Sequence, residues 1–192
     1  NFHTFITVVG SGSAIRAIVH WGGGKIDVYK SNGSQLVPES YGVYDQLYSD
    51  GSDYVVKTKR QVEYRFSKQG GSGAAVLYLS SIRDRNGNTL TVNYESGVNG
   101  TKRIANVSDG NRKLTFSYRS GTDLVSSVSD PLGRSIKFAY TYNNNTGRYQ
   151  LSQFTDAKNQ STSYLYGNDT KVSTSKLLTR IQLPKGNYIE NE

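Results

Sequence analysis

One pattern recurs along this chain and limits its fold more than any other feature. An aspartate, two variable residues and a glycine are followed by an apolar alternation that ends in tyrosine, ten residues after the aspartate. The clearest copies have Asp84, Gly87 and Tyr94, and Asp130, Gly133 and Tyr140. An aspartate carboxylate accepts backbone amide protons across a turn, and glycine tolerates a positive φ angle. Each copy therefore predicts a β-hairpin.

Three further copies depart from this pattern. A shortened copy has Asp109 and Gly110 in its turn and ends at Tyr118. Another copy has Asp156, with Asn159 in the glycine position. The last copy has Leu183 in place of the aspartate, keeps Gly186 and is truncated. Asparagine is the residue that best replaces glycine at a positive φ. We count about four complete copies and a fifth incomplete one.

The returning strands place their apolar residues on one face, because side chains alternate along a strand. The predicted core aromatics are Tyr94, Phe116, Tyr118, Phe138, Tyr140, Tyr164 and Tyr166. A chain with 15 Tyr, 20 Gly and only 35% hydrophobic residues is typical of short, half-solvated strands. The sequence therefore predicts an all-β fold of tandem antiparallel hairpins, each stabilised by its neighbours.

The domain organisation predicted from this pattern has two parts. Residues 1–70 form an irregular β-hairpin lead-in, with apolar runs at 14–21 and 25–29, and residues 71–192 carry the repeats. A glycine-rich stretch at 68–73 is the linker candidate between them.

The repeat motifs resemble those of the YD-repeat, or rearrangement-hotspot, family, whose turn reads Asp-x-x-Gly-Arg. Asp130 to Arg134 is the closest match, and the resemblance extends over roughly residues 22 to 192. It implies a curved or spiralling β-sheet, a segment of a shell in large secreted or cell-surface proteins, which in bacteria encloses a toxin domain and in teneurins serves adhesion. The implied partners are the rest of the same repeat protein, neighbouring copies through open strand edges, and a toxin cargo.

Residues for catalysis are scarce. The chain has no cysteine, and its two histidines, His3 and His20, stand in no metal-spaced cluster or nucleophile motif. The aspartates of the repeats share one turn position, which favours a local hydrogen-bonding role over metal binding. We expect no enzyme activity, no catalytic residue, no metal and no cofactor.

Two features favour a binding role. Tyrosines cluster at Tyr41, Tyr44 and Tyr48, and again at Tyr142 and Tyr149, where sugar rings would stack; the alternative is that they are core or cross-strand residues. The net charge of +8 is compatible with an anionic glycan, although its scattered distribution favours a solvated face. We expect no nucleic-acid partner and no membrane span.

Three hypotheses follow. The leading one is a structural, encapsulating segment of a secreted or cell-surface protein, with head-to-tail assembly as a variant. The second is a module that binds glycans or a cell-wall polymer. An enzyme is the third and weakest.

Overall fold

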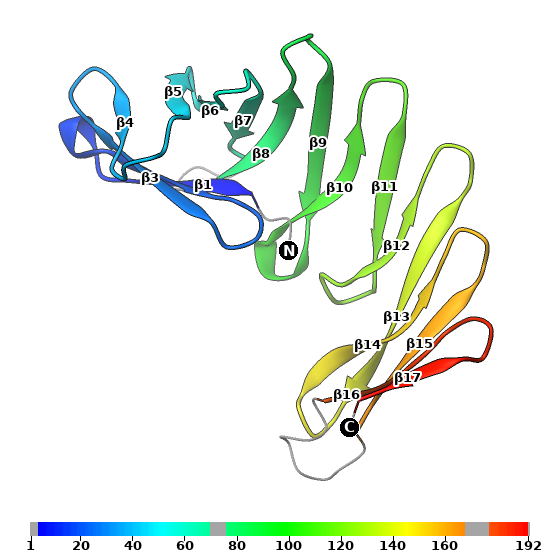
Figure 1. Ribbon diagram of the computed structural model, residues 1–192. Helices are drawn as coiled ribbons and strands as arrows, with labels where there is room; N and C mark the ends of the chain where they lie inside the picture. Colours follow the sequence, from blue (N-terminus) through cyan, green and yellow to red (C-terminus); the bar gives the residue numbers. More distant parts are fainter. Residues whose placement is uncertain (1–3, 70–75, 168–176, 192) are drawn as a thin grey trace. The chain divides into compact units, whose positions relative to one another are not determined.

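The structure is a computed structural model that describes residues 4–69, 76–167 and 177–191 (Figure 1). It is all-β, and its strands pair antiparallel with their sequence neighbours through hairpins, which confirms the coarse fold prediction. Two compact units are present, one of residues 1–96 and 102–112 and the other of residues 97–101 and 113–192. The predicted linker lies mostly on residues 70–75, outside the described residues.

The first unit contains ten strands and a short 3-10 turn. They are β1 (Phe5–Val9), η1 (Gly12–Ala14), β2 (Arg16–His20), β3 (Ile26–Ser31), β4 (Leu36–Pro38), β5 (Gln46–Asp50), β6 (Asp53–Lys57), β7 (Glu63–Ser67), β8 (Val76–Arg83), β9 (Thr89–Ser96) and β10 (Lys102–Ser108).

The first eight strands form a closed ring. Each pairs with the next along the chain, and β1 also pairs with β8, where Phe5 faces Tyr78 and Ile6 faces Leu77. The predicted spiralling repeat sheet is therefore wrong for this part of the chain, because a sheet closed on itself does not continue as a spiral. Closure also leaves no open edge in the ring.

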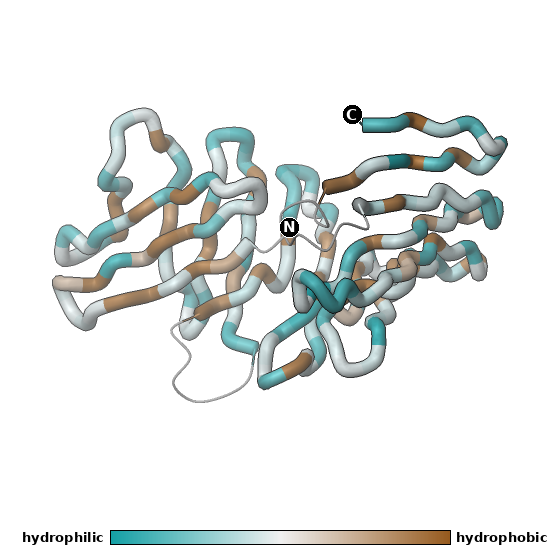
Figure 2. The backbone as a smooth tube through the Cα atoms, turned by 90° about the horizontal axis from the view of Figure 1, so that it is seen from below, coloured by the Kyte–Doolittle hydropathy of each residue, from teal (hydrophilic) through white to brown (hydrophobic). Residues whose placement is uncertain are grey.

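Alternation along the strands fills the ring with apolar side chains. The fully buried core residues are Ile6, Ala17, Val19, Tyr29, Leu47, Val56, Phe66 and Leu77. Most of their neighbours in sequence are less buried, and several are polar, as Arg65 is beside Phe66. The interior of an eight-stranded barrel is just wide enough for side chains to fill it. In Figure 2 the strands of this unit carry the brown, hydrophobic stretches, whereas the connecting loops are mostly teal or white.

The hairpin of β9 and β10 extends the sheet from β8. β8 pairs with β9 over three residues, from Ser81 facing Thr91 to Arg83 facing Thr89. β9 pairs with β10 along most of its length, with a bulge after Ile104.

The second unit is a row of seven antiparallel strands, each paired with the next along the chain. They are β11 (Lys113–Tyr118), β12 (Val125–Ser129), β13 (Ser135–Asn143), β14 (Arg148–Thr155), β15 (Ser161–Tyr166), β16 (Leu178–Gln182) and β17 (Tyr188–Glu190), and the unit also includes the turn η2 (Val98–Gly100). One face carries apolar residues such as Phe116, Val128 and Ile136 in register, and the other carries mainly serine, threonine and glutamine. None of its described side chains is fully buried.

No helix in the described part of the chain is long and apolar enough to cross a membrane.

Candidate functional site

The aspartates of the repeats all lie in tight turns between strands. Asp130 Oδ1 accepts the backbone N–H groups of Leu132 and Arg134, each at 3.0 Å, and Oδ2 accepts from Arg134 Nε at 2.7 Å. Gly133 completes the turn at φ +79°. The side-chain hydrogen bond from Arg134, helped by the two amides, lowers the pKa of Asp130.

The related turns repeat this arrangement with different partners. Asp84 accepts the amides of residues 86 and 88 and the side-chain amide of Asn88, which lowers its pKa, and Gly87 has φ +89°. In the shortened turn Asp109 accepts the amide and the guanidinium of Arg112, which lower its pKa, and Gly110 has φ +93°.

The two departing turns keep the backbone geometry. Asp156 Oδ1 accepts the amides of Lys158 and Gln160, each at 2.8 Å, while Asn159 adopts φ +61°. The last turn has no carboxylate, and only backbone bonds join Leu183 to Asn187 and Gly186. Gly186 lies at φ +86°. All five turns therefore serve local backbone geometry.

Two of the repeat tyrosines close gaps between strands, a role that the sequence did not indicate. Tyr94 OH donates to the carbonyl of Leu79 at 3.0 Å, and Tyr140 OH donates to that of Val125 at 2.8 Å. In both cases the acceptor lies 15 residues before the tyrosine. Burial raises the pKa of Tyr140. The other predicted core aromatics, Phe116, Tyr118, Phe138, Tyr164 and Tyr166, are all half-buried.

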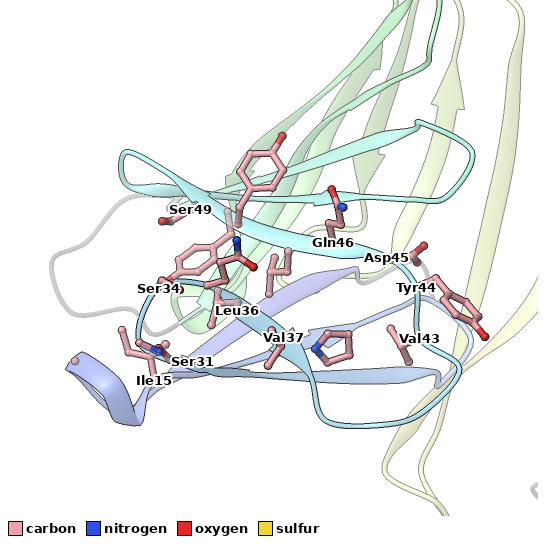
Figure 3. Close-up of a pocket in the computed structure, with 17 residues that line it drawn as sticks. Ile15, Ser31, Ser34, Leu36, Val37, Val43, Tyr44, Asp45, Gln46 and Ser49 are labelled. Atoms are coloured by element: carbon pink, nitrogen blue, oxygen red, sulfur yellow. The ribbon is translucent and has the colours of Figure 1, made fainter.

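A large cleft lies in the first unit, between β4 and β5. Its volume is about 710 Å³, and most of its lining comes from the β3–β4 turn, β4, β5 and the connection between β4 and β5 (Figure 3). Residues near η1, at the end of β3 and in β6 complete it, among them Ile15, Ser31 and Tyr54. Leu36 and Leu47 form the only Cα pair between the two strands, so the wall of the ring is open on either side of that pair. The cleft therefore extends from the outer surface down to core residues such as Leu47.

Aromatic and polar groups line this cleft together. Tyr44 and Tyr48 are 74% and 41% exposed, and Gln35, Gln46 and Ser49 supply amide and hydroxyl groups. The Tyr44 ring also has the Lys59 ammonium 5.4 Å from its centroid. Tyr41, the third member of the predicted cluster, is fully exposed and does not line the cleft.

The base of the cleft is tied to the core. Tyr29 is fully buried, and its hydroxyl donates to the carbonyl of Asp45 at 3.2 Å. Burial raises the pKa of Tyr29 well above its ordinary value, so the hydroxyl stays protonated and able to donate. Asp45 Oδ1 also accepts the backbone amide of Lys59 at 3.3 Å. Among the described residues that line the cleft, Asp45 is the one charged residue, and none is a lysine or an arginine.

The second predicted tyrosine cluster lies in the second unit. The rings of Tyr142 and Tyr149 pack edge to face at 5.0 Å, and the Arg119 guanidinium lies 4.1 Å from the centre of the Tyr149 ring. Tyr142 lines a smaller cleft of about 450 Å³ at the end of β13 and β14.

The histidines and carboxylates of the described residues form no metal-binding group. His20 stacks on Phe5 with ring centroids 4.3 Å apart, and its Nε2 lies 3.4 Å from Thr7 Oγ1. His3 lies outside the described residues. In the part of the chain that the structure describes, no three His, Cys, Asp or Glu side chains are grouped as metal ligands.

Comparison with known proteins gives no family. No family model matches the chain, and no curated protein matches it. A solved structure that it resembles is a porin-like protein from Bacteroides uniformis, with 12% identity and a TM-score of 0.41 over 93% of this chain and 86% of that one.

The resemblance to the YD-repeat family is therefore corrected. No family model supports it, and the closed ring of β1–β8 is not a segment of a repeat sheet. The physical reason is that an Asp-x-x-Gly turn and a strand ending in tyrosine specify one hairpin, in whatever antiparallel fold contains it. The toxin cargo and the shell rested on that resemblance and lose their basis.

Proposed function

We propose that this chain is a carbohydrate-binding module of a secreted or cell-surface protein, and that it binds a neutral saccharide in the cleft between β4 and β5. The observation that carries the proposal is the cleft's described lining, in which exposed tyrosines lie beside amides and hydroxyls and no residue is a lysine or an arginine.

The lining matches the chemistry of a sugar. The C–H face of a pyranose ring is apolar and packs on an aromatic ring such as Tyr48, while its hydroxyls need donors and acceptors at the edge. The carboxamides of Gln35 and Gln46 each offer two donors and an acceptor. A cleft of about 710 Å³ falls in the size range of small-molecule sites.

The charge of the lining favours a neutral ligand over the anionic glycan considered from the net charge. An anionic glycan would need cationic partners, since a buried or half-buried charge is costly without one. The one charged side chain among the described lining residues is Asp45, whose carboxylate accepts hydrogen bonds from hydroxyls and repels anions. The Lys59 ammonium at the rim already lies over the Tyr44 ring, 5.4 Å from its centroid.

The test is titration calorimetry of the whole chain with a panel of neutral oligosaccharides, including xylan, mannan and glucan fragments. We expect one or more to bind, and Tyr48→Ala to weaken binding roughly 10-fold, since truncating a stacked aromatic costs about 1–2 kcal/mol. Tyr188→Ala is the matched control, because Tyr188 is 56% exposed on β17 and lines no part of this cleft. Absence of binding to any fragment, or equal affinity of the Tyr48→Ala variant, would contradict the proposal.

A structural role is the second proposal, and the sheet of the second unit favours it. β17 pairs with β16 alone among the described strands, and its Tyr188 and Ile189 are 56% and 55% exposed. A strand edge of this kind pairs readily with a strand of a neighbouring copy. Sedimentation velocity at increasing concentration tests this: self-association that Ile189→Lys abolishes supports a scaffold, and a monomer at all concentrations argues against it.

A further inference from the structure

A second cleft in the second unit arises where two neighbouring strands separate. β14 and β15 pair only from Gln153 facing Ser163 to Thr155 facing Ser161. Before Gln153 and after Ser163 the two strands are no longer partners, although each still pairs with its other neighbour. The resulting notch has a volume of about 450 Å³. Its lining comes from the β13–β14 hairpin on one side and from β15 on the other.

Two equivalent junctions elsewhere in the chain are closed by a tyrosine hydroxyl. β8 and β9, and β12 and β13, also pair over only three residues before they separate. There Tyr94 and Tyr140 donate to a carbonyl of the preceding strand. At the junction of β14 and β15 the corresponding residue is Tyr166, which lies ten residues after Asp156 and lines the notch. Within the described residues its hydroxyl makes no such bond, and the notch lies at this junction.

The notch presents uncharged polar and aromatic groups. The described residues that line it include no acidic or basic side chain, and they combine Tyr142, Tyr164 and Tyr166 with amides and hydroxyls. The β4–β5 cleft likewise combines tyrosines with amides and hydroxyls, although its lining also contains the carboxylate of Asp45.

The groups at its rim are held in place before any ligand arrives. Asn143 Nδ2 donates to Gln150 Oε1 at 2.9 Å, and Asn143 Oδ1 accepts the amide of Asn145 at 2.9 Å. Tyr142 is 49% exposed, and its ring is fixed by the edge-to-face contact with Tyr149. A ring already fixed in position loses little entropy when a ligand stacks on it.

We propose that the notch between β14 and β15 is a second binding site for a neutral saccharide, with Tyr142 as the stacking surface and Tyr166 OH as a hydrogen-bonding group. The ligand class rests on the proposed function, whereas the site itself is separate and lies in the other unit. Its consequence is a chain with two saccharide sites, which raises affinity for a polysaccharide above that for a short fragment wherever both sites engage one polymer.

The experiment counts sites in the whole chain by titration calorimetry with a short neutral oligosaccharide that the wild type binds. We expect a stoichiometry of two, with Tyr142→Ala weakening one site roughly 10-fold and, independently, Tyr48→Ala weakening the other by a similar factor, so that each variant keeps one site at the wild-type affinity. Tyr166→Phe keeps the ring and removes only the hydroxyl, so it should weaken the second site several-fold. Tyr188→Ala leaves both sites intact, and circular dichroism checks that every variant is folded.

The outcomes separate the two proposals. A stoichiometry of one, with binding that only Tyr48→Ala weakens, overturns the second site and leaves the β4–β5 cleft standing. A stoichiometry of one, with binding that only Tyr142→Ala weakens, supports the notch and overturns the cleft. Binding that neither variant affects overturns both, as does a chain that binds an extended peptide but no saccharide.

Discussion

Replacing Tyr140 with phenylalanine tests whether a tyrosine hydroxyl holds diverging strands together. The change removes one hydroxyl and keeps the ring. That hydroxyl donates to the carbonyl of Val125 at 2.8 Å, and both residues are half-buried. Such a bond contributes about 0.5–1.5 kcal/mol, and a carbonyl left without a partner adds to the loss. We expect Tyr140→Phe to lower the free energy of unfolding by about 1 kcal/mol.

Tyr166→Phe is the matched control for this prediction. Tyr166 occupies the same repeat position in the same unit, and its hydroxyl lacks the bond to the preceding strand within the described residues. We expect its free energy of unfolding to change by less than about 0.5 kcal/mol. Urea denaturation followed by circular dichroism measures both variants on the same transition. An equal loss in the two variants, or no loss in Tyr140→Phe, would refute the role assigned to the hydroxyl.

Three further predictions concern the core and the turns. Phe66 is fully buried, so Phe66→Ala should lower the free energy of unfolding by about 3–5 kcal/mol. Urea unfolding measures this loss, with Phe66→Leu as the comparison. Hydrogen bonds lower the pKa of Asp84, Asp109 and Asp130, so their stabilisation is present above the unfolded pKa of about 4 and is lost as pH falls through the lower folded values. The free energy of unfolding measured in urea should therefore be lower at pH 3 than at pH 6. In the triple Asp→Asn variant the difference between the two pH values should be smaller. Because Gly133 lies at φ +79°, Gly133→Ala should lower the free energy of unfolding by about 1–2 kcal/mol, and Gly133→Asn should lower it by less. Thermal unfolding measures both losses.

The turns were predictable because their chemistry is local. The carboxylate of Asp130 contacts amides two and four residues further on, and the glycine between them needs only a positive φ. Residue type and spacing carry all of this information. The same holds for the strands on either side, whose alternation the sequence displays directly.

Closure of the ring was not predictable, because it depends on residues far apart in the chain. Phe5 pairs with Tyr78, and nothing in either segment specifies the other. An alternating strand fits equally well in an open sheet, a sandwich or a ring. The family resemblance failed for the same reason, since the turn at Asp130 to Arg134 is compatible with every antiparallel arrangement of hairpins.

The candidate cleft was predictable only in part. Tyr44 and Tyr48 lie close together in sequence, and their clustering indicated a binding surface before the fold was known. Gln35 and Leu36 come from the preceding hairpin, and only the pairing of β4 with β5 places them opposite those tyrosines. Tyr142 and Tyr149 were likewise grouped by sequence, but the notch itself depends on where β14 and β15 separate.

The shortest strand pairing in the ring, between β4 and β5, explains why the cleft opens there. β4 has only three residues, and it ends at Pro38, which has no backbone N–H to donate. A single pair, Leu36 with Leu47, joins it to β5, whereas β2 with β3 and β5 with β6 each pair over five residues. The well-paired strands hold the ring closed, so the cleft between β4 and β5 forms without loss of the fold. Closure of the ring and the opening for a ligand are thus consequences of the same uneven distribution of strand pairing.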